Sequence, residues 1–204
     1  MKVAVLVSGG GTNLGAIIKA AHSGIIKSAE IVCVVSNREG AYALTRAENA
    51  GIPHRAITKK EYGDNFEAEI ISYLDSMGVE LVVLAGYMAI ISPEFIKKYE
   101  NRMINIHPSL IPSFCGKGFY GLHVHEAALK YGVKVTGATV HFVSEVVDGG
   151  AIILQKAVEI QPSDTPETLQ RRVMEEAEWE LLPRAIELVA SGRVSLSGRK
   201  TQIR

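Results

Sequence analysis

The stretch KVAVLVSGGGTNLGAIIKAA (residues 2–21) decides the fold class. It begins with a continuous apolar run from Val3 to Val7, without the alternation expected of a strand that has one face in water. Three glycines follow, and the next residues have the spacing of an amphipathic helix. The apolar stripe of this helix consists of Leu14, Ile17, Ile18 and Ala21. A buried strand, a glycine loop and a helix in this order predict the start of a parallel α/β sheet.

The same alternation continues through the first half of the chain. Residues 41–50 and about 64–77 have helical spacing, and they separate further apolar runs. These runs are Ile31 to Val35, Leu81 to Ala85 and Met103 to Ile106. The pattern predicts an α/β fold with a doubly wound, mostly parallel sheet and right-handed crossovers.

The second half has a different pattern. Two long β-branched runs, Val135 to Val143 and Ile152 to Ile160, flank Asp148-Gly149-Gly150 and predict an antiparallel portion around a sharp turn. A long helix is expected from Thr165 as N-cap and Pro166 as first helical residue. We expect Pro183 to kink or break that helix.

Length and composition limit the domain organisation and the class of partner. The 204 residues are 47% apolar and 22% charged, with 22 basic and 22 acidic side chains, so the formal net charge is zero. This balance argues against nucleic acid or a membrane surface as partner. We expect one domain over residues 1–204, with halves at about 1–100 and 101–190, and a short tail at 191–204 that forms a hairpin.

Cysteine usage and apolar runs point to a compartment. The chain has two cysteines, Cys33 and Cys115, and such sparse usage is typical of a reducing environment. The longest apolar stretch, residues 81–91, is shorter than a membrane helix requires, and the first apolar run is too short for a secretory signal. We therefore expect a cytoplasmic protein.

The loop Ser8 to Asn13 predicts an anion site. Consecutive glycines let backbone N–H groups approach a phosphate, and the following helix N-terminus adds free donors. Leu14 stands where the dinucleotide fingerprint needs its last glycine, and Ser36-Asn37 stands where that fingerprint needs an acid. No Walker lysine follows either. A simple tight turn is the alternative.

Two polar side chains mark the end of the run that starts at Met103. Strand alternation places Asn105 and His107 on one face, and Pro108 ends the strand, so both lie at its carboxyl edge. An amide donor and a histidine suit a developing oxyanion, although a single histidine is often only structural. His123 and His125 could suggest zinc, but we expect no metal there, and we interpret His123 as a helix-start or loop-packing residue.

Asp148 is the third candidate. An aspartate before two glycines is common in turns for local reasons alone. The functional alternative is that Asp148 reaches His107, orients the ring and favours its protonated form.

Four segments in this order resemble the folate-dependent formyltransferase family, from residue 1 to about residue 190. They are Ser8-Gly9-Gly10-Gly11-Thr12-Asn13, Leu84-Ala85-Gly86-Tyr87-Met88, Asn105 to Pro112, and Gly137-x-Thr139-Val140-His141-Phe142-Val143 with Asp148-x-Gly150. The glycine loop and the length favour the phosphoribosylglycinamide formyltransferase branch. The resemblance implies a Rossmann-like formyltransferase fold, 10-formyltetrahydrofolate as co-substrate and no metal.

The resemblance also implies the roles of site residues. The catalytic trio would be Asn105, His107 and Asp148. The substrate's phosphate and ribose would be held by Gly10, Gly11, Thr12, Asn13 and Glu178. Folate would contact Met88, Ala89, Ile90, Ile91, Val143, Ser144, Glu145, Val146 and Val147. Three features depart from the family: Ala89 replaces a common arginine, Glu175 replaces a common basic residue and is expected to point elsewhere, and the loop at Cys115 to Tyr120 is longer.

The implied activity is transfer of a formyl group to the amine of glycinamide ribonucleotide in de novo purine synthesis, by a monomer or homodimer acting on small molecules. Formyltetrahydrofolate deformylase and methionyl-tRNA formyltransferase are the nearest alternatives, and each would need an additional domain. A non-catalytic nucleotide-binding module is the alternative outside enzymes. The presence of all three candidate catalytic residues argues against it.

Overall fold

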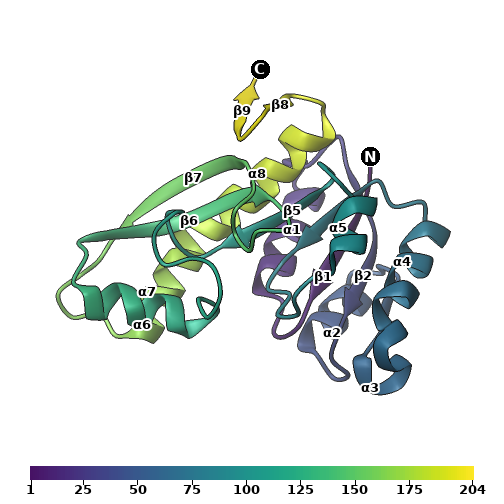
Figure 1. Ribbon diagram of the computed structural model, residues 1–204, viewed down its shortest axis with the longest axis horizontal. Helices are drawn as coiled ribbons and strands as arrows, with labels where there is room; N and C mark the ends of the chain where they lie inside the picture. The colour runs from purple at the N-terminus through teal and green to yellow at the C-terminus, as the bar shows by residue number, and fades with distance from the viewer. The chain divides into compact units, whose positions relative to one another are not determined.

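The computed structural model describes all residues from 1 to 204. The chain divides into two compact units, Met1–Ile104 and Asn105–Arg204 (Figure 1). The boundary lies close to the division into halves expected at about residue 100. That residues 1–204 act as a single domain stays a prediction.

The first unit alternates strands and helices. Its elements are β1 (Lys2–Val7), α1 (Thr12–His22), β2 (Glu30–Ser36), α2 (Tyr42–Asn49), β3 (His54–Ala56), α3 (Lys59–Tyr62), the 3₁₀ turn η1 (Gly63–Asn65), α4 (Phe66–Ser76), β4 (Leu81–Leu84) and α5 (Pro93–Lys98). The strand β5 (Met103–His107) begins in this unit and continues into the second.

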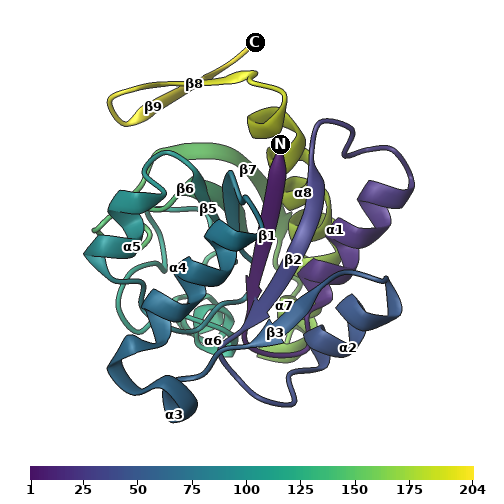
Figure 2. The same ribbon diagram turned by 90° about the vertical axis from the view of Figure 1, so that its right-hand side faces the viewer.

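The strands of the first unit are parallel, in the order β3-β2-β1-β4. Figure 2 shows α1 and α2 on one side of these strands and α4 and α5 on the other. The doubly wound parallel arrangement predicted from the sequence is therefore confirmed. Among these four strands, β3 alone was not predicted from the sequence, because three residues are too few to show a period.

Helices on both faces explain the unbroken apolar runs. Val3 to Val7 of β1 have no exposed surface, and all of β4 is buried. On α1 the buried apolar residues are Leu14, Ile17 and Ala20, whereas Ile18 and Ala21 are only half-buried. The stripe is thus slightly rotated from the predicted one, and it still orients the helix on the strands.

The second unit contains the rest of β5 and the remaining elements. They are α6 (Leu122–Tyr131), β6 (Val135–Phe142), β7 (Ile152–Glu159), α7 (Pro166–Val173), the π turn η2 (Met174–Glu178), α8 (Trp179–Ala190), β8 (Val194–Ser197) and β9 (Lys200–Ile203). Helix α7 packs on α6, and α8 packs on β6 and β7.

The antiparallel portion predicted for the second half is confirmed. β6 pairs with β7 from Val135 opposite Glu159 to His141 opposite Ile152, and the register shifts between Val140 and His141. The tail also forms the expected hairpin, with β8 antiparallel to β9. No helix of the chain is long and apolar enough to span a membrane.

The long C-terminal helix begins as predicted, with a capping box at Thr165 and Pro166 in the first turn. Pro183 does not break the helix, because it lies inside α8; a kink at this residue stays a prediction. The irregularity instead lies upstream, in the five-residue π turn η2. Proline leaves the carbonyl of Trp179, four residues earlier, without its helical N–H, and the wide turn ends just before that residue.

Candidate active site

The three polar residues predicted to converge do so within the second unit. The carboxylate of Asp148 lies 3.6 Å from His107, measured from Oδ2 to Nδ1. Its other oxygen, Oδ1, lies 3.6 Å from Nε2 of His141. The amide nitrogen of Asn105 in turn lies 3.2 Å from that Nε2. The cluster therefore combines residues from the ends of β5 and β6 with Asp148 from the turn between β6 and β7.

The turn between β6 and β7 places Asp148. The residue adopts a left-handed backbone with φ of 54°, which is uncommon outside glycine and asparagine or aspartate. Gly149 follows, and its N–H donates to the carbonyl of Val146 at 2.8 Å. A Cβ on Gly150 would lie 1.7 Å from the carbonyl oxygen of Phe142, so only glycine fits there. The turn therefore requires glycine at position 150, and it places the Asp148 carboxylate beside His107.

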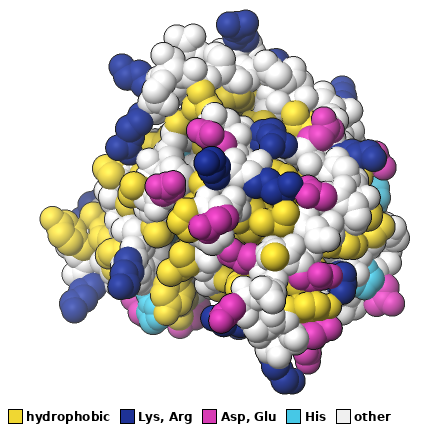
Figure 3. All heavy atoms as spheres, turned by 45° about the vertical axis from the view of Figure 1, so that its right-hand side comes forward, with side chains coloured by type: hydrophobic (Ala, Val, Ile, Leu, Met, Phe, Trp, Pro, Cys, Tyr) yellow, Lys and Arg dark blue, Asp and Glu magenta, His cyan; other side chains and the backbone are white.

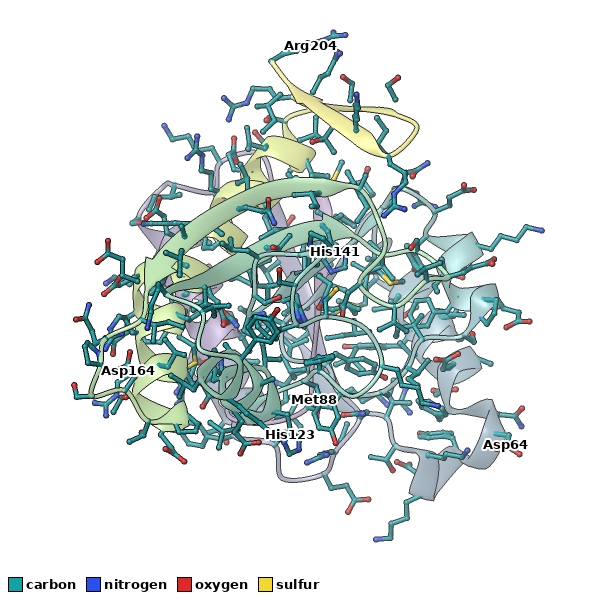
Figure 4. The ribbon with its side chains drawn as sticks, turned by 60° about the vertical axis from the view of Figure 1, so that its left-hand side comes forward. Asp64, Met88, His123, His141, Asp164 and Arg204 are labelled. Carbon is teal, nitrogen blue, oxygen red and sulfur yellow. The ribbon has the colours of Figure 1, made fainter.

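His141 is the member of this cluster that sequence reasoning missed (Figure 4). Its Nδ1 lies 2.8 Å from the carbonyl oxygen of Phe142, which can only accept, so Nδ1 carries a proton. In the neutral ring Nε2 is then an acceptor, and it receives an N–H of Asn105. The pairing register shifts at His141, where Ile153 of β7 is skipped, and such irregularities re-aim side chains at strand ends. A histidine alternating with Thr139 on β6 was the available signal.

The loop after β5 covers this cluster. His107 donates from Nε2 to the carbonyl oxygen of Phe114 at 2.9 Å. The N–H of Gly116 donates to Oδ2 of Asp148 at 2.8 Å. Phe114 has φ of 48°, and its ring packs edge-on against Phe119 and Tyr131. The backbone of this loop thus holds both polar groups, a role that side-chain patterns in the sequence do not predict.

Burial and charge oppose each other at His107. The ring is 4% exposed, and burial holds the pKa of His107 below its usual value, although the neighbouring Asp148 carboxylate and the Phe114 carbonyl raise it in part. Burial would also raise the pKa of Asp148, but the His141 and His107 rings and the Gly116 amide hold it below its usual value. Asp148 is therefore ionised at neutral pH. Both neighbours of His107 are acceptors, so the protonated ring satisfies both of them.

The two histidines of α6 have different surroundings. His123 is exposed, pairs with Glu126 at 3.0 Å and packs against Tyr120 (Figure 4). It lies in the first turn of α6, as predicted. His125 is fully buried, neither ring nitrogen has a hydrogen-bond partner, and burial lowers its pKa to about 4, helped by nearby His107. No group of three or more His, Cys, Asp or Glu is arranged to hold a metal ion.

The glycine loop of the first unit has the features of an anion cradle. A Cβ on Gly9 or Gly10 would meet nothing within 4 Å, so the backbone there is open to a ligand. Gly11 is the residue before α1, with φ of 68°, and a Cβ on it would lie 2.6 Å from that of Ala43. Arg46 of α2 donates from Nε to the carbonyl oxygen of Gly10 at 2.8 Å. Sequence reasoning missed this arginine, which satisfies that carbonyl.

The segments expected to bind folate are partly open to solvent. In the first unit Met88 and Ile90 are exposed, whereas Ile91 is buried; the N–H of Met88 donates to Oγ of Ser8 at 2.8 Å. In the second unit Val146 and Val147 are exposed. Exposed apolar side chains in loops are suited to packing against an aromatic ligand.

On the long helix, Glu178 is 6% exposed, whereas Glu175 is exposed. Both residues lie in the π turn η2, and the expectation that Glu175 points away from the substrate stays a prediction. On the face of the molecule in Figure 3, basic and acidic side chains are interspersed, without a patch of one sign.

The fold and the cluster define an α/β protein with an amide, an imidazole and a carboxylate gathered where β5 ends. The chain belongs to the formyl transferase family, whose profile matches residues 1–186. The resemblance stated from the sequence motifs and the predicted fold class are both confirmed.

The relatives give the particular branch. A phosphoribosylglycinamide formyltransferase of Haemophilus influenzae is 45% identical over 197 residues, covering 96% of this chain and 90% of that protein. The trifunctional purine biosynthetic protein adenosine-3 of Gallus gallus is 50% identical over 198 residues; the match covers 96% of this chain, which spans only 19% of that protein.

Solved structures agree with this grouping. A glycinamide ribonucleotide transformylase of Symbiobacterium toebii is 42% identical, with a TM-score of 0.93, covering 100% of this chain and 93% of the other. A formyltetrahydrofolate deformylase of Pseudomonas syringae is 29% identical, with a TM-score of 0.89; the match covers 99% of this chain and 65% of the deformylase. The similarity is thus greater to the transformylase branch.

Proposed function

We propose that this chain transfers the formyl group of 10-formyltetrahydrofolate to the amine of glycinamide ribonucleotide, producing formylglycinamide ribonucleotide and tetrahydrofolate. The observation that carries the proposal is the cluster of Asn105, His107 and Asp148 in a chain that matches a phosphoribosylglycinamide formyltransferase over 90% of that protein's length. The proposal includes a cytoplasmic setting, small-molecule partners and no metal.

In the proposed mechanism the neutral amine attacks the formyl carbon, and the formyl oxygen becomes an oxyanion. Asn105 donates an amide N–H to that oxygen, and the protonated ring of His107 donates from Nε2. Asp148, ionised beside Nδ1, stabilises the imidazolium. The carbon–nitrogen bond to the folate then breaks, and a proton from the attacking nitrogen passes to the departing folate nitrogen, directly or through water.

One step comes before the chemistry. Nε2 of His107 is bonded to the carbonyl of Phe114, so this carbonyl must leave before the ring can donate to the formyl oxygen. Gly116 and Gly118, which follow Phe114 in the loop, have positive φ and give the loop alternative backbone conformations. Substrate binding would therefore displace the loop locally.

The remaining roles complete the proposal. The backbone of Gly10 to Asn13 would bind the substrate's phosphate, because a Cβ on Gly10 would meet nothing within 4 Å and α1 begins at Thr12. Glu178 would bind the ribose. Met88 to Ile91 and Val143 to Val147 would contact the folate, chiefly through backbone groups.

The test is an absorbance assay of formyl folate consumption with and without glycinamide ribonucleotide. Consumption that requires the ribonucleotide supports the proposal, whereas equal consumption without it indicates a deformylase and refutes it. In the same assay Asn105→Ala should lower turnover by about 10²–10³-fold and leave the KM for the ribonucleotide nearly unchanged, since one oxyanion donor is lost. Full turnover in that variant would remove Asn105 from the mechanism.

A further inference from the structure

The C-terminal hairpin lies beyond the family profile, which ends at residue 186. Strands β8 and β9 pair only with each other, and β9 packs against β7 (Figure 1). Thr201 of β9 donates from Oγ1 to the carbonyl of Ile152, the first residue of β7, at 2.7 Å. The hairpin is therefore attached at the point where the chain leaves the turn that carries Asp148.

A second contact reaches the turn itself. Arg199, in the β8–β9 connection, donates from Nη2 to the carbonyl oxygen of Gly149 at 3.0 Å. The N–H of the same Gly149 donates to Val146 within the turn. Both polar backbone groups of the residue after Asp148 are thus bonded, one inside the turn and one to the hairpin.

The position of this contact matters because Asp148 itself has an unfavourable backbone conformation. With φ of 54°, it depends on its neighbours to remain there. Its carboxylate is 3.6 Å from His107, so a small rotation of the Asp148–Gly149 peptide would move the charge away from the ring. The Gly149 N–H bond to Val146 holds this peptide on one side, and the Arg199 donor holds the Gly149–Gly150 peptide that follows, so the two bonds together limit movement of the turn.

We propose that Arg199 is a positioning residue for the reaction, holding the 148–150 turn so that the Asp148 carboxylate stays beside His107. The inference rests on the proposed function for its kinetic consequence. Its structural content, control of the Asp148–His107 pair by the hairpin, does not depend on which substrate is used.

The experiment compares Arg199→Met with two other variants. Lys200→Met removes an adjacent exposed positive charge and is the matched control. Arg199→Lys keeps a cationic donor and should restore part of the effect. The histidine ring of residue 107 is titrated by NMR in each folded protein, and turnover and both KM values are measured across pH.

The direction of the change in the His107 pKa distinguishes a positioning role of Arg199 from the simple loss of its charge. Removing a positive charge alone would raise the pKa of His107, whereas moving Asp148 away would lower it. We expect a lower His107 pKa in Arg199→Met, with the loss of activity toward high pH shifted to lower pH. Turnover should fall about three- to tenfold, because one hydrogen bond that holds the turn is lost. The KM for the ribonucleotide and the melting temperature should be unchanged.

A His107 pKa in Arg199→Met that is unchanged, or raised as far as in Lys200→Met, would overturn the proposal. So would a loss of turnover that only follows a loss of folded protein. If the wild-type chain fails to formylate the ribonucleotide, the proposed function fails, and the titration still decides the role of Arg199.

Discussion

His125 allows a test of how burial changes the pKa of an ionisable group in this fold and, through it, the stability of the protein. The ring is fully buried on α6, and neither nitrogen has a hydrogen-bond partner. Its pKa is lowered from 6.5 to about 4, first by burial and then by nearby His107. The unfolded chain therefore binds this proton more readily than the folded chain does. The contribution of neutral His125 to stability is present above pH 6.5 and is lost as the pH falls toward 4.

The magnitude follows from the two pKa values. Their difference, about 2.5, corresponds to about 3 kcal/mol of unfolding free energy in full. Between pH 7 and pH 5 the loss is about 2 kcal/mol, which lowers the urea midpoint by roughly 1 M. His125→Leu keeps a buried side chain of similar size and cannot take up the proton, so it should lack this part of the acid sensitivity.

The assay is urea unfolding of the wild type and of His125→Leu at pH 7 and pH 5, together with NMR titration of the histidines. His123→Gln is the control, since His123 is exposed on the same helix. The control should keep the full pH dependence of the wild type. A His125 resonance that titrates near 6.5 in the folded protein, or equal pH slopes for the wild type and His125→Leu, would refute the reasoning.

Three further predictions concern the two candidate binding regions. Asp148→Asn should lower the pKa of His107, because the carboxylate that raises it is gone, and should reduce turnover by about 10²-fold or more; NMR titration and the formyl transfer assay measure both. Arg46→Met frees the Gly10 carbonyl and should raise the KM for glycinamide ribonucleotide about three- to tenfold with little change in turnover; an unchanged KM would contradict the role of Arg46. Gly11→Ala should destabilise the protein by about 1–3 kcal/mol through its positive φ and steric overlap, whereas Gly9→Ala, facing open space, should be close to neutral in thermal unfolding.

Much of the fold could be predicted because its signals are local. Continuous apolar runs such as Val3 to Val7 require cover on both faces, and the helical spacing between them supplies it. The start of the long helix could likewise be predicted from Thr165 as N-cap and Pro166 in the first turn. The continuation of α8 through Pro183 was not predicted, because the sequence pattern does not show the packing of this helix on β6 and β7.

The candidate site likewise contains residues that local sequence signals predict and contacts that they do not. Asn105, His107 and Asp148 could be predicted because each stands at a strand end or a glycine turn, where side chains converge. The Phe114 carbonyl could not, because every residue has a carbonyl and only the loop's path brings this one to His107. Arg199 is distant along the chain from the turn it contacts, and its sequence neighbourhood gives no reason to connect the two.

The contacts of Phe114 and Gly116 also set a limit on ligand affinity. Any molecule that accepts a hydrogen bond from His107 competes with an acceptor already attached to the same chain, at a concentration that dilution cannot lower. Its measured Kd is the intrinsic value divided by the fraction of chains whose loop is displaced. A compound that leaves the loop in place and binds beside it would escape this competition, and selection of inhibitors against the closed loop would favour such compounds.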